Sequence, residues 1–311
     1  MSPVTVAATQ TAAEAGAAGT QGAPPAIEIE HVSKTFRLPK QRYSTLKERA
    51  LHPMRSSEFD ELHAVQDVDV RIEQGEFFGI VGRNGSGKST LLKLLAGVYR
   101  PQHGNVLLAG LDMHQIAEDA LREHVAYLPQ DYRLVQGTLR ENLLLGRPNP
   151  GDDELMACAT RTGLAPFIAA HPQGLDMPIA EGGGGISGGQ RQLVGLTRML
   201  LAKPGLWLLD EPTAALDRDS EKRVLAALDR CAAADSTVVM VTHKMSLLKL
   251  VRRVIVIAGG KIVMDGPTAQ VVEQLHRTAV AAAANSSAAS AATETNAAAP
   301  KLMAAAGGQR A

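Results

Sequence analysis

The segment GRNGSGKST, residues 82–90, constrains the fold more than any other part of the chain. It matches the pattern G-x-x-x-x-G-K-[ST] and lies between an apolar run, FFGIV, and a run with helical character, TLLKLLAGV. In that context the glycines let backbone N–H groups surround phosphate oxygens, and the N-terminus of the following helix adds partial positive charge. An ordinary glycine-rich turn is the alternative, but a Lys-Ser pair at this offset favours a phosphate loop. The segment therefore predicts a nucleoside triphosphate site.

Each residue of this loop has an expected part in the site. Lys88 is expected to reach the β- and γ-phosphates and act in catalysis, and the Ser89 hydroxyl is expected to ligate Mg²⁺. The residues expected to contact the nucleotide are Gly82, Arg83, Asn84, Gly85, Ser86, Gly87, Lys88, Ser89 and Thr90.

Short apolar runs alternate with helical patterns along the chain. Residues 63–82 predict two strands around a turn at Gln74-Gly75, and residues 26–36, AIEIEHVSKTF, alternate as an edge strand does. GLWLLD and STVVMVTH are short apolar runs bounded by breakers, as expected of buried parallel strands. Helical stretches, notably SEKRVLAALDRCAA, lie between the strands. The pattern predicts an α/β fold built on a parallel sheet.

Composition separates a folded core from two tails. Residues 1–26 and 277–311 consist mostly of small residues and contain too few large apolar ones to offset the entropy of ordering. We therefore expect disordered tails around a folded domain at 27–276, with transient helix as the alternative for the Ala-rich C-terminal tail. The 32 Lys and Arg balance 32 Asp and Glu, so net charge indicates no nucleic-acid or anionic-lipid partner. No apolar run approaches the ~20 residues that span a bilayer, so any membrane role is expected to depend on a partner.

Two acidic residues follow one another where the apolar run LWLLD ends. Because ligands bind beside the C-terminal ends of parallel strands, Asp210 and Glu211 are expected near the phosphates. Asp210 suits Mg²⁺ coordination through water, and Glu211 suits a general base that activates the attacking water. The alternative is that one of the two only caps the next helix.

Six short motifs follow one another in a characteristic order. They are the phosphate loop, YLPQD with Gln130, ISGGQ at 186–190, LWLLDE at 206–211, AALD at 214–217 and VTH ending at His243. From about residue 27 to 276 the chain resembles the ATP-binding subunit of an ABC transporter. The resemblance implies ATP and Mg²⁺ as cofactors and a P-loop NTPase core with a parallel sheet. It also implies an N-terminal antiparallel β subdomain and a helical subdomain, at about 131–200, that carries the SGGQ motif.

The resemblance also implies a dimer. In ABC ATPases two such domains stack head to tail with two ATP molecules at their interface, so a second copy of this chain is the expected partner. The SGGQ segment of one subunit then faces the γ-phosphate held by the other, through Ser187, Gly188, Gly189 and Gln190. Ser187 and the glycine amides stand at a helix start and can donate to an anion. Ser187 as the N-cap of that helix is a compatible interpretation.

Four more site residues come from the resemblance. Gln130 would ligate Mg²⁺ or water, His243 would contact the γ-phosphate, and Asp217 would signal across the dimer. Phe36, in VSKTF, resembles the aromatic residue that stacks on adenine. A structural histidine and a plain edge or core aromatic are the alternatives for His243 and Phe36.

The chain resembles two kinds of exporter. The basic insertion at 37–63 and the segment through the phosphate loop are similar to ATPases of polysaccharide and teichoic-acid exporters. Beyond about residue 110 the chain is similar to protein and peptide exporters of the type I secretion class. Both imply an ATPase subunit on the cytoplasmic face of the inner or plasma membrane, attached through a separate permease and without a nucleic-acid partner. Glu181 stands where the second class has an acidic residue that touches the membrane domain; a solvated loop acid is the alternative. Gly182–Gly185 are expected to form a flexible approach to ISGGQ.

A soluble ABC ATPase that acts on nucleic acid or ribosomes is the alternative function. Chromosome and repair proteins of this type split their motifs around long coiled coils, and translation-associated ones carry two ATPase domains. This sequence contains one set of motifs without such an insertion. The ISGGQ motif also disfavours a P-loop kinase or GTPase.

Overall fold

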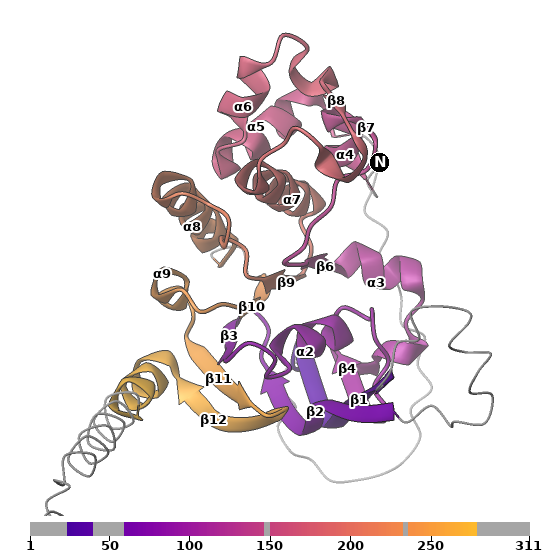
Figure 1. The fold of residues 1–311 in the computed structure, drawn as a ribbon, viewed down its shortest axis with the longest axis vertical. Coiled ribbons are helices and arrows are strands. Elements are labelled where there is room, and N and C mark those ends of the chain that lie inside the picture. The colour runs from indigo at the N-terminus through magenta and orange to yellow at the C-terminus, as the bar shows by residue number, and fades with distance from the viewer. Residues whose placement is uncertain (1–23, 40–58, 146–149, 233–235, 279–311) are drawn as a thin grey trace, which may run out of the picture.

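The computed structural model of the chain describes residues 24–39, 59–145, 150–232 and 236–278. Most of the two expected tails and of the basic insertion lies outside these described residues. Figure 1 shows the arrangement: two sheets, one helix between them and a layer of helices on the other side of the larger sheet.

The larger sheet carries the strands that the sequence predicts as buried and parallel. Its order is β12-β11-β3-β10-β9-β6, and only the pairing of β11 with β12 is antiparallel. Val241 at the end of β10 lies opposite both Ile80 of β3 and Asp210 of β9, so these strands end at one edge. The strands are β3 (Phe77–Gly82), β6 (Val125–Leu128), β9 (Leu206–Asp210), β10 (Thr237–Val241), β11 (Arg253–Ala258) and β12 (Lys261–Pro267).

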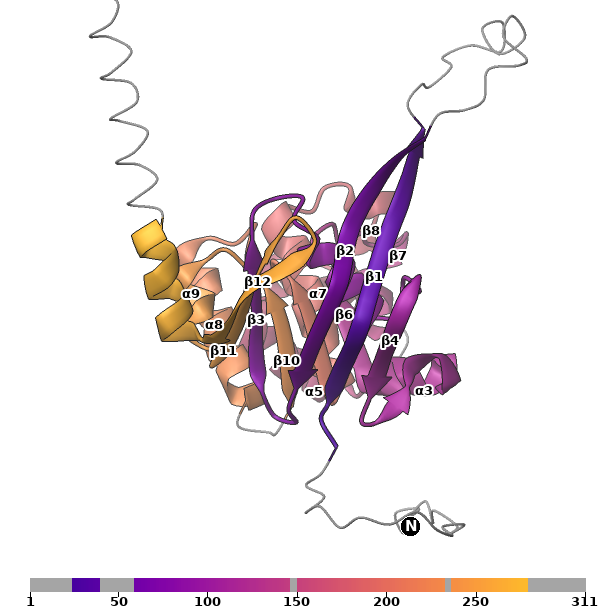
Figure 2. The same cartoon turned by 90° about the horizontal axis from the view of Figure 1, so that it is seen from below.

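The smaller sheet is antiparallel, in the order β2-β1-β4-β5. Its strands are β1 (Ile27–Pro39), β2 (Phe59–Ile72), β4 (His103–Leu108) and β5 (Leu111–Asp112). The expectation of an edge strand at 26–36 is therefore wrong, because β1 pairs with β2 on one side and β4 on the other. Its alternation has another cause: one face of the sheet packs on the core and the other faces water, which produces the same pattern in an interior strand. Figure 2 shows β1 and β2 extending well beyond their neighbours.

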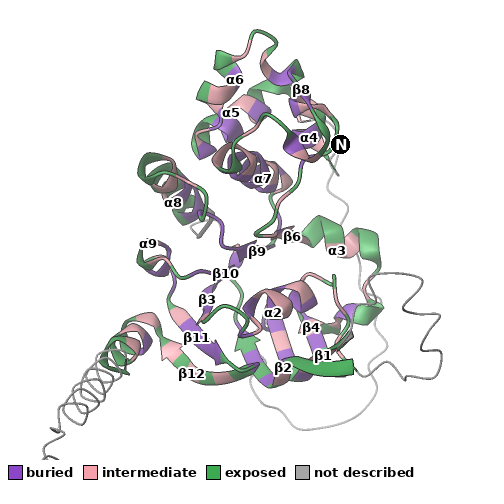
Figure 3. Ribbon diagram, in the orientation of Figure 1, coloured by how far each residue is buried: buried purple, intermediate pink, exposed green. Residues whose placement is uncertain are grey.

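Helix α2 (Lys88–Leu95) lies between the two sheets, directly after the phosphate loop. Four of its leucines are at most 1% exposed and share one hydrophobic cluster with both sheets. The alternation along β9 divides the core: Leu206 and Leu208 face this cluster, whereas Trp207 and Leu209 face the helices on the other side. Burying both faces explains why β9 and β10 are apolar throughout, and Figure 3 shows them buried in the middle of the molecule.

The other face of the sheet is covered by a layer of helices that includes the one predicted to start at the SGGQ motif. Helix α5 packs against α7 and α8 there, and all three contribute to a second hydrophobic cluster. This layer contains β7 (Gly137–Thr138), α4 (Leu139–Leu144), α5 (Asp152–Thr162), α6 (Ala165–Ala170), η2 (Gly174–Asp176), β8 (Pro178–Ile179), η3 (Glu181–Gly183), α7 (Gly188–Ala202) and α8 (Arg218–Ala232). The remaining elements are η1 (Met113–Gln115), α3 (Glu118–His124), α9 (Met245–Leu248) and a helix over residues 268–278.

Candidate functional site

The C-terminal ends of β3, β9 and β10 border a pocket of about 380 Å³. This volume lies within the ~300–1,000 Å³ range of small-molecule sites. Among the sequence-predicted residues, the pocket is lined by Phe36, Asn84, Gly85, Ser86, Gly87, Lys88, Ser89, Thr90, Gln130, Asp210, Glu211 and His243. Gly82 and Arg83 adjoin it through contacts with Lys88. Five further predicted residues do not line it: Ser187, Gly188, Gly189, Gln190 and Asp217.

The ammonium group of Lys88 is held at the phosphate loop by its own backbone. Its Nζ donates to the carbonyl oxygens of Gly82 at 2.8 Å and Arg83 at 2.9 Å. Burial lowers the pKa of Lys88, and the nearby acidic side chains of Glu211 and Asp210 oppose that shift. Gly87 is required by the loop: its φ is +108°, and a Cβ there would stand 2.0 Å from the carbonyl oxygen of Ala64.

The Asp210 carboxylate is only 2% exposed, and its Oδ1 has no hydrogen-bond partner among the described residues. Burial raises the pKa of Asp210, and a hydrogen bond from Ser89 opposes this shift. The buried hydroxyl of Ser86 likewise lacks a partner within the described part of the chain. Buried polar atoms without partners are rare, and carboxylate and hydroxyl oxygens are the ligands that Mg²⁺ prefers. Asp210 with Ser89 therefore fits a magnesium site beside the phosphate loop.

Glu211 and His243 form a pair at the pocket. Oε1 of Glu211 lies 2.8 Å from Nδ1 of His243, with the glutamate side chain 11% and the histidine side chain 71% exposed. Glu211 has a left-handed backbone with φ +50°, and its N–H donates to the carbonyl oxygen of Val241 at 2.9 Å. A carboxylate and an imidazole in contact can hold and pass a proton at the mouth of the pocket. The resemblance implies that His243 contacts a phosphate, which stays a prediction; within the subunit His243 lies against the carboxylate of Glu211.

Phe36 forms one wall of the pocket together with residues that the sequence did not indicate. Its ring packs edge to face on Tyr99, with centroids 5.4 Å apart. Leu62, which lies opposite Phe36 in the β1–β2 pairing, and Ala64 also line the pocket. Their pairing could not be foreseen because residues 40–58 separate the two strands and hide the register.

The SGGQ segment forms the start of α7 and lies away from this pocket. Ser187 and Gln190 make a reciprocal capping box: Gln190 N–H donates to Ser187 Oγ at 3.1 Å, and Ser187 N–H donates to Gln190 Oε1 at 2.9 Å. The N-cap interpretation of Ser187 thus describes its contacts within the subunit. A Cβ on Gly189 would stand 2.9 Å from the carbonyl oxygen of Ala215, so this glycine is also required by packing inside the subunit.

Asp217 has a capping role that the sequence interpretation did not assign to it. Its Oδ1 accepts hydrogen bonds from the N–H groups of Asp219 and Ser220, both at 2.9 Å. The hydrogen bonds from Ser220 lower the pKa of Asp217. It therefore caps α8, the role that had been considered for Asp210 and Glu211.

Residues 182–185 form a compact turn where a flexible approach had been expected. Gly182, Gly183 and Gly185 have φ values of 70°, 78° and 85°, and Gly183 is buried. Hydrogen bonds join Gly183 N–H to the Ala180 carbonyl at 2.9 Å and Ile186 N–H to the Gly183 carbonyl at 3.1 Å. The glycines supply left-handed turn geometry, a use that composition alone does not distinguish from a linker. Glu181, just before them, is exposed.

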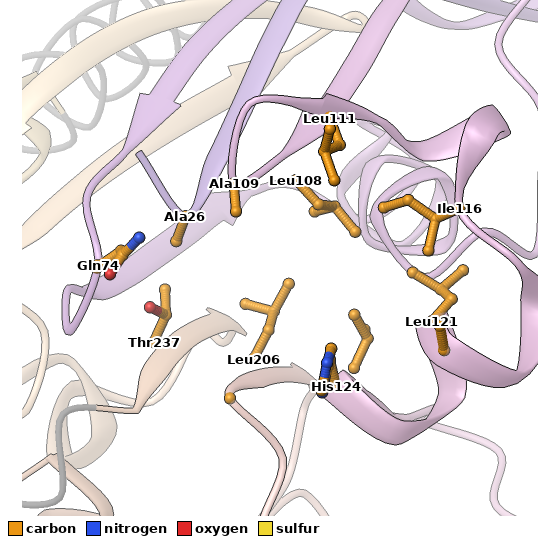
Figure 4. Close-up of a pocket in the computed structure, with 13 residues that line it drawn as sticks. Ala26, Gln74, Leu108, Ala109, Leu111, Ile116, Leu121, His124, Leu206 and Thr237 are labelled. Atoms are coloured by element: carbon orange, nitrogen blue, oxygen red, sulfur yellow. The ribbon is translucent and has the colours of Figure 1, made fainter. Parts of the chain in front are cut away.

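A second pocket, of about 500 Å³, lies at the opposite edge of the larger sheet. It is lined mainly by apolar side chains such as Leu108, Ile116 and Leu206, with Thr237 and His124 among its few polar members (Figure 4). Leu206 and Thr237 begin β9 and β10, so this pocket is at the amino ends of the strands. Ligands of parallel sheets bind at the carboxyl ends, and none of the sequence-predicted site residues lies here.

Comparison with known proteins identifies the family. The sequence profile of the ABC transporter family matches residues 65–214. The ATP-dependent lipid A-core flippase of Neisseria gonorrhoeae is 39% identical over 215 residues, which cover 69% of this chain and 34% of that protein. The cyclolysin secretion/processing ATP-binding protein of Bordetella pertussis is 36% identical over 207 residues, covering 67% of this chain and 29% of that protein. The chain thus spans about a third of the length of the curated relatives that it matches.

The fold has a solved counterpart. The structure of a bacterial Atm1-family ABC exporter with ATP bound superposes with a TM-score of 0.67 and 27% identity, covering 81% of this chain and 40% of that one. Among the described residues, no helix combines the length and the apolar character needed to cross a membrane. The expected α/β P-loop fold is confirmed, and the chain belongs to the ABC transporter family, as a nucleotide-binding domain.

Proposed function

We propose that this chain hydrolyses ATP to drive export through a permease that spans the membrane. The observation that carries the proposal is that the phosphate loop, Asp210, Glu211 and His243 line the same pocket, at the ends of three strands. A phosphate cradle next to a carboxylate with an adjacent imidazole has the parts that triphosphate hydrolysis needs.

Each residue has a part in the proposed reaction. Phe36 stacks on the adenine, and the backbone of residues 82–90 with Lys88 holds the phosphates. Ser89, Gln130 and Asp210 would hold Mg²⁺, which would neutralise charge on the phosphate oxygens. Glu211 accepts a proton from the attacking water, and His243 orients Glu211 and contacts the γ-phosphate.

The proposed working unit is a head-to-tail homodimer. The phosphate pocket of one subunit lacks any contribution from its own Ser187–Gln190 segment, which lies at the start of α7. In the proposal this segment completes the pocket of the second subunit, with Asp217 next to the interface. Both nucleotides are then shared between subunits.

The proposed cargo belongs to an export pathway. The relatives named above are a lipid A-core flippase and a cyclolysin secretion protein, and a third, from Staphylococcus aureus, is a putative multidrug export ATP-binding/permease protein 35% identical over 213 residues. We propose a polysaccharide or a protein or peptide as the substrate, with a separate permease anchoring the chain at the cytoplasmic face of the membrane. Glu181, exposed beside α7, is a proposed contact for that permease.

Two measurements test this function. The purified chain should release phosphate from ATP in the presence of Mg²⁺ and lose that activity when Mg²⁺ is chelated. Tagged chain isolated from membranes should carry an integral-membrane subunit, and its class decides the substrate: a polysaccharide-type or a peptide-type permease. Phosphate release without any membrane subunit, with binding to ribosomes or nucleic acid instead, would favour the alternative function.

A further inference from the structure

The backbone of Glu211 needs support from its surroundings. Its φ of +50° lies in the left-handed region, which a residue with a Cβ rarely adopts. Its N–H is held by the Val241 carbonyl oxygen and its carboxylate by His243. The remaining polar group, its carbonyl oxygen, accepts one hydrogen bond from the N–H of Ala214 within the loop, at 3.1 Å, and a second from a side chain outside this strand edge. The donor is on α7.

That donor is Gln192, a buried side chain that is 8% exposed. Its Nε2 donates to the carbonyl oxygen of Glu211 at 2.8 Å, and its Oε1 accepts from the N–H of Ala215 at 3.0 Å. The orientation of the amide follows from these partners, because a carbonyl oxygen can only accept and a backbone N–H can only donate. One side chain thus holds both ends of the loop from Glu211 to Ala215.

Close packing reinforces the same connection. A Cβ on Gly189 would stand 2.9 Å from the Ala215 carbonyl oxygen, and one on Gly188 would stand 3.5 Å from the Ala215 Cβ. The first turn of α7 therefore lies directly on the backbone of this loop. A displacement of that turn toward the loop would press on the backbone of Ala215.

We propose that Gln192 is a positioning residue for ATP hydrolysis. It holds the main chain of Glu211 in the conformation that directs the carboxylate into the phosphate pocket. It also ties Glu211 to the helix whose first turn faces the nucleotide of the second subunit. Within one subunit, Glu211, the base of its own ATP site, then moves together with the first turn of α7, which completes the ATP site of the second subunit. This inference rests on the proposed function, with Glu211 as the base.

A purely structural role for Gln192 makes a different prediction. In that case its loss lowers the stability of the fold, and the molecules that remain folded turn over ATP normally. A positioning role instead lowers kcat while ATP binding is retained, because Gln192 does not line the phosphate pocket. The two roles are separated by measuring kcat, KM and ATP affinity together with the melting temperature.

The experiment uses the full chain with Gln192→Met and Gln192→Glu. Gln192→Met keeps the length of the side chain and removes both hydrogen bonds, whereas Gln192→Glu keeps an acceptor for Ala215 and removes the donor to Glu211. The matched control is Thr197→Val. Thr197 is a fully buried polar residue of the same helix. Its hydroxyl donates to the Leu193 carbonyl at 2.7 Å and contacts Thr162, away from the loop.

We expect both Gln192 variants to lower kcat by about tenfold to a hundredfold, the effect of misplacing a catalytic group by roughly 1 Å. KM and the affinity for a fluorescent ATP analogue should change little. Thr197→Val should lower the melting temperature and leave kcat of the folded protein unchanged. In single-turnover assays, adding Gln192→Met to Glu211→Gln should slow hydrolysis no further, because the group that Gln192 positions is already gone.

Three results would overturn the proposal. They are a wild-type kcat in Gln192→Met, an equal fall of kcat in Thr197→Val, and a further fall when Gln192→Met is added to Glu211→Gln. Absence of ATP hydrolysis in the wild-type chain is a separate outcome, which refutes the proposed function itself and this inference with it. The wild-type rate tests the function, and the ratio of variant to wild type tests Gln192.

Discussion

Lys88 is the residue whose removal tests the phosphate loop most directly. Its Nζ donates to the carbonyl oxygens of Gly82 and Arg83, which belong to the same loop. Lys88→Ala therefore removes the charge, and the two hydrogen bonds lost with it are local to that loop. We expect ATP turnover to fall by at least about a hundredfold, the typical cost of losing one fixed transition-state donor. Phosphate release by the purified variant measures this. Substantial remaining hydrolysis contradicts the assignment, and Lys222→Ala, an exposed lysine of α8, is the control.

Glu211 tests the chemical step and not binding. Glu211→Gln keeps a side chain of the same shape that can still contact His243, but it cannot take a proton from water. We expect hydrolysis to fall by about 10²–10⁴-fold, the usual contribution of a general base, with ATP binding preserved. Single-turnover hydrolysis and equilibrium binding of a fluorescent ATP analogue separate the two effects. Normal turnover in this variant removes Glu211 as the base.

At the scale of residues, spacing predicted the groups that line the pocket but not all of their contacts. The phosphate loop, Asp210 and Glu211 were predictable because the chemistry needs those residue types next to strand ends. The contact of Glu211 with Gln192 was not predictable from the sequence, since α7 and β9 meet only through tertiary packing. Asp217 was assigned a signalling role from the resemblance, and its function as the cap of α8 became visible only with its hydrogen bonds.

At the scale of elements, Glu221 connects α8 to the start of α9 and, through Lys244, to the loop after β9. It pairs with Lys244 at 2.5 Å and accepts from Ser246, and Lys244 also donates to the Thr213 carbonyl oxygen at 2.6 Å. The hydrogen bonds from Lys244 and Ser246 lower the pKa of Glu221 below its ordinary value of 4.5. Glu221→Gln should cost about 1–3 kcal/mol at neutral pH, because Lys244 is left without its charged partner.

The pH dependence of that cost has a definite sign. Since the folded state holds the lower pKa, the contribution of Glu221 is complete above about pH 4.5 and is lost as pH falls through the folded-state value. Urea unfolding at pH 7, 5 and 4 should show the difference between wild type and Glu221→Gln shrinking toward low pH. Asp219→Asn, on the exposed side of α8, is the control and should change stability little. A difference independent of pH contradicts the assignment.

The elements themselves were predictable where local pattern and environment agree. The phosphate loop with its strand and helix, β9, β10 and the helix after ISGGQ all appear where periodicity indicates them. The position of a strand within its sheet was not predictable, as β1 shows. An interior strand with one solvent-exposed face alternates in the same way as an edge strand. The turn at residues 182–185 was missed for a related reason: glycine permits both a linker and consecutive left-handed residues, and only the neighbours decide between them.

At the scale of the whole molecule, the sharing of each ATP site between two subunits can be tested at Ser187. Ser187 does not line the pocket of its own subunit, so Ser187→Arg should leave ATP binding by the monomer intact. In a head-to-tail dimer the added side chain would meet the phosphates of the second subunit, and turnover should stop. The substitution also removes the cap on α7. Ser187→Ala is therefore the control for the lost cap; it should cost about 1 kcal/mol of stability and, because it adds no bulk at the phosphates, lower turnover far less than Ser187→Arg does.

Mixing two inactive variants makes this test specific. A dimer of one Lys88→Ala subunit and one Ser187→Arg subunit has one site in which both Lys88 and Ser187 are wild type. The mixture should therefore regain part of the turnover that each variant lacks alone, as measured by phosphate release over a range of mixing ratios. Regained activity can arise only if the two residues of one working site come from different subunits, because neither chain contains both. Wild-type turnover in Ser187→Arg alone would instead show that α7 contributes nothing to the site of a second subunit.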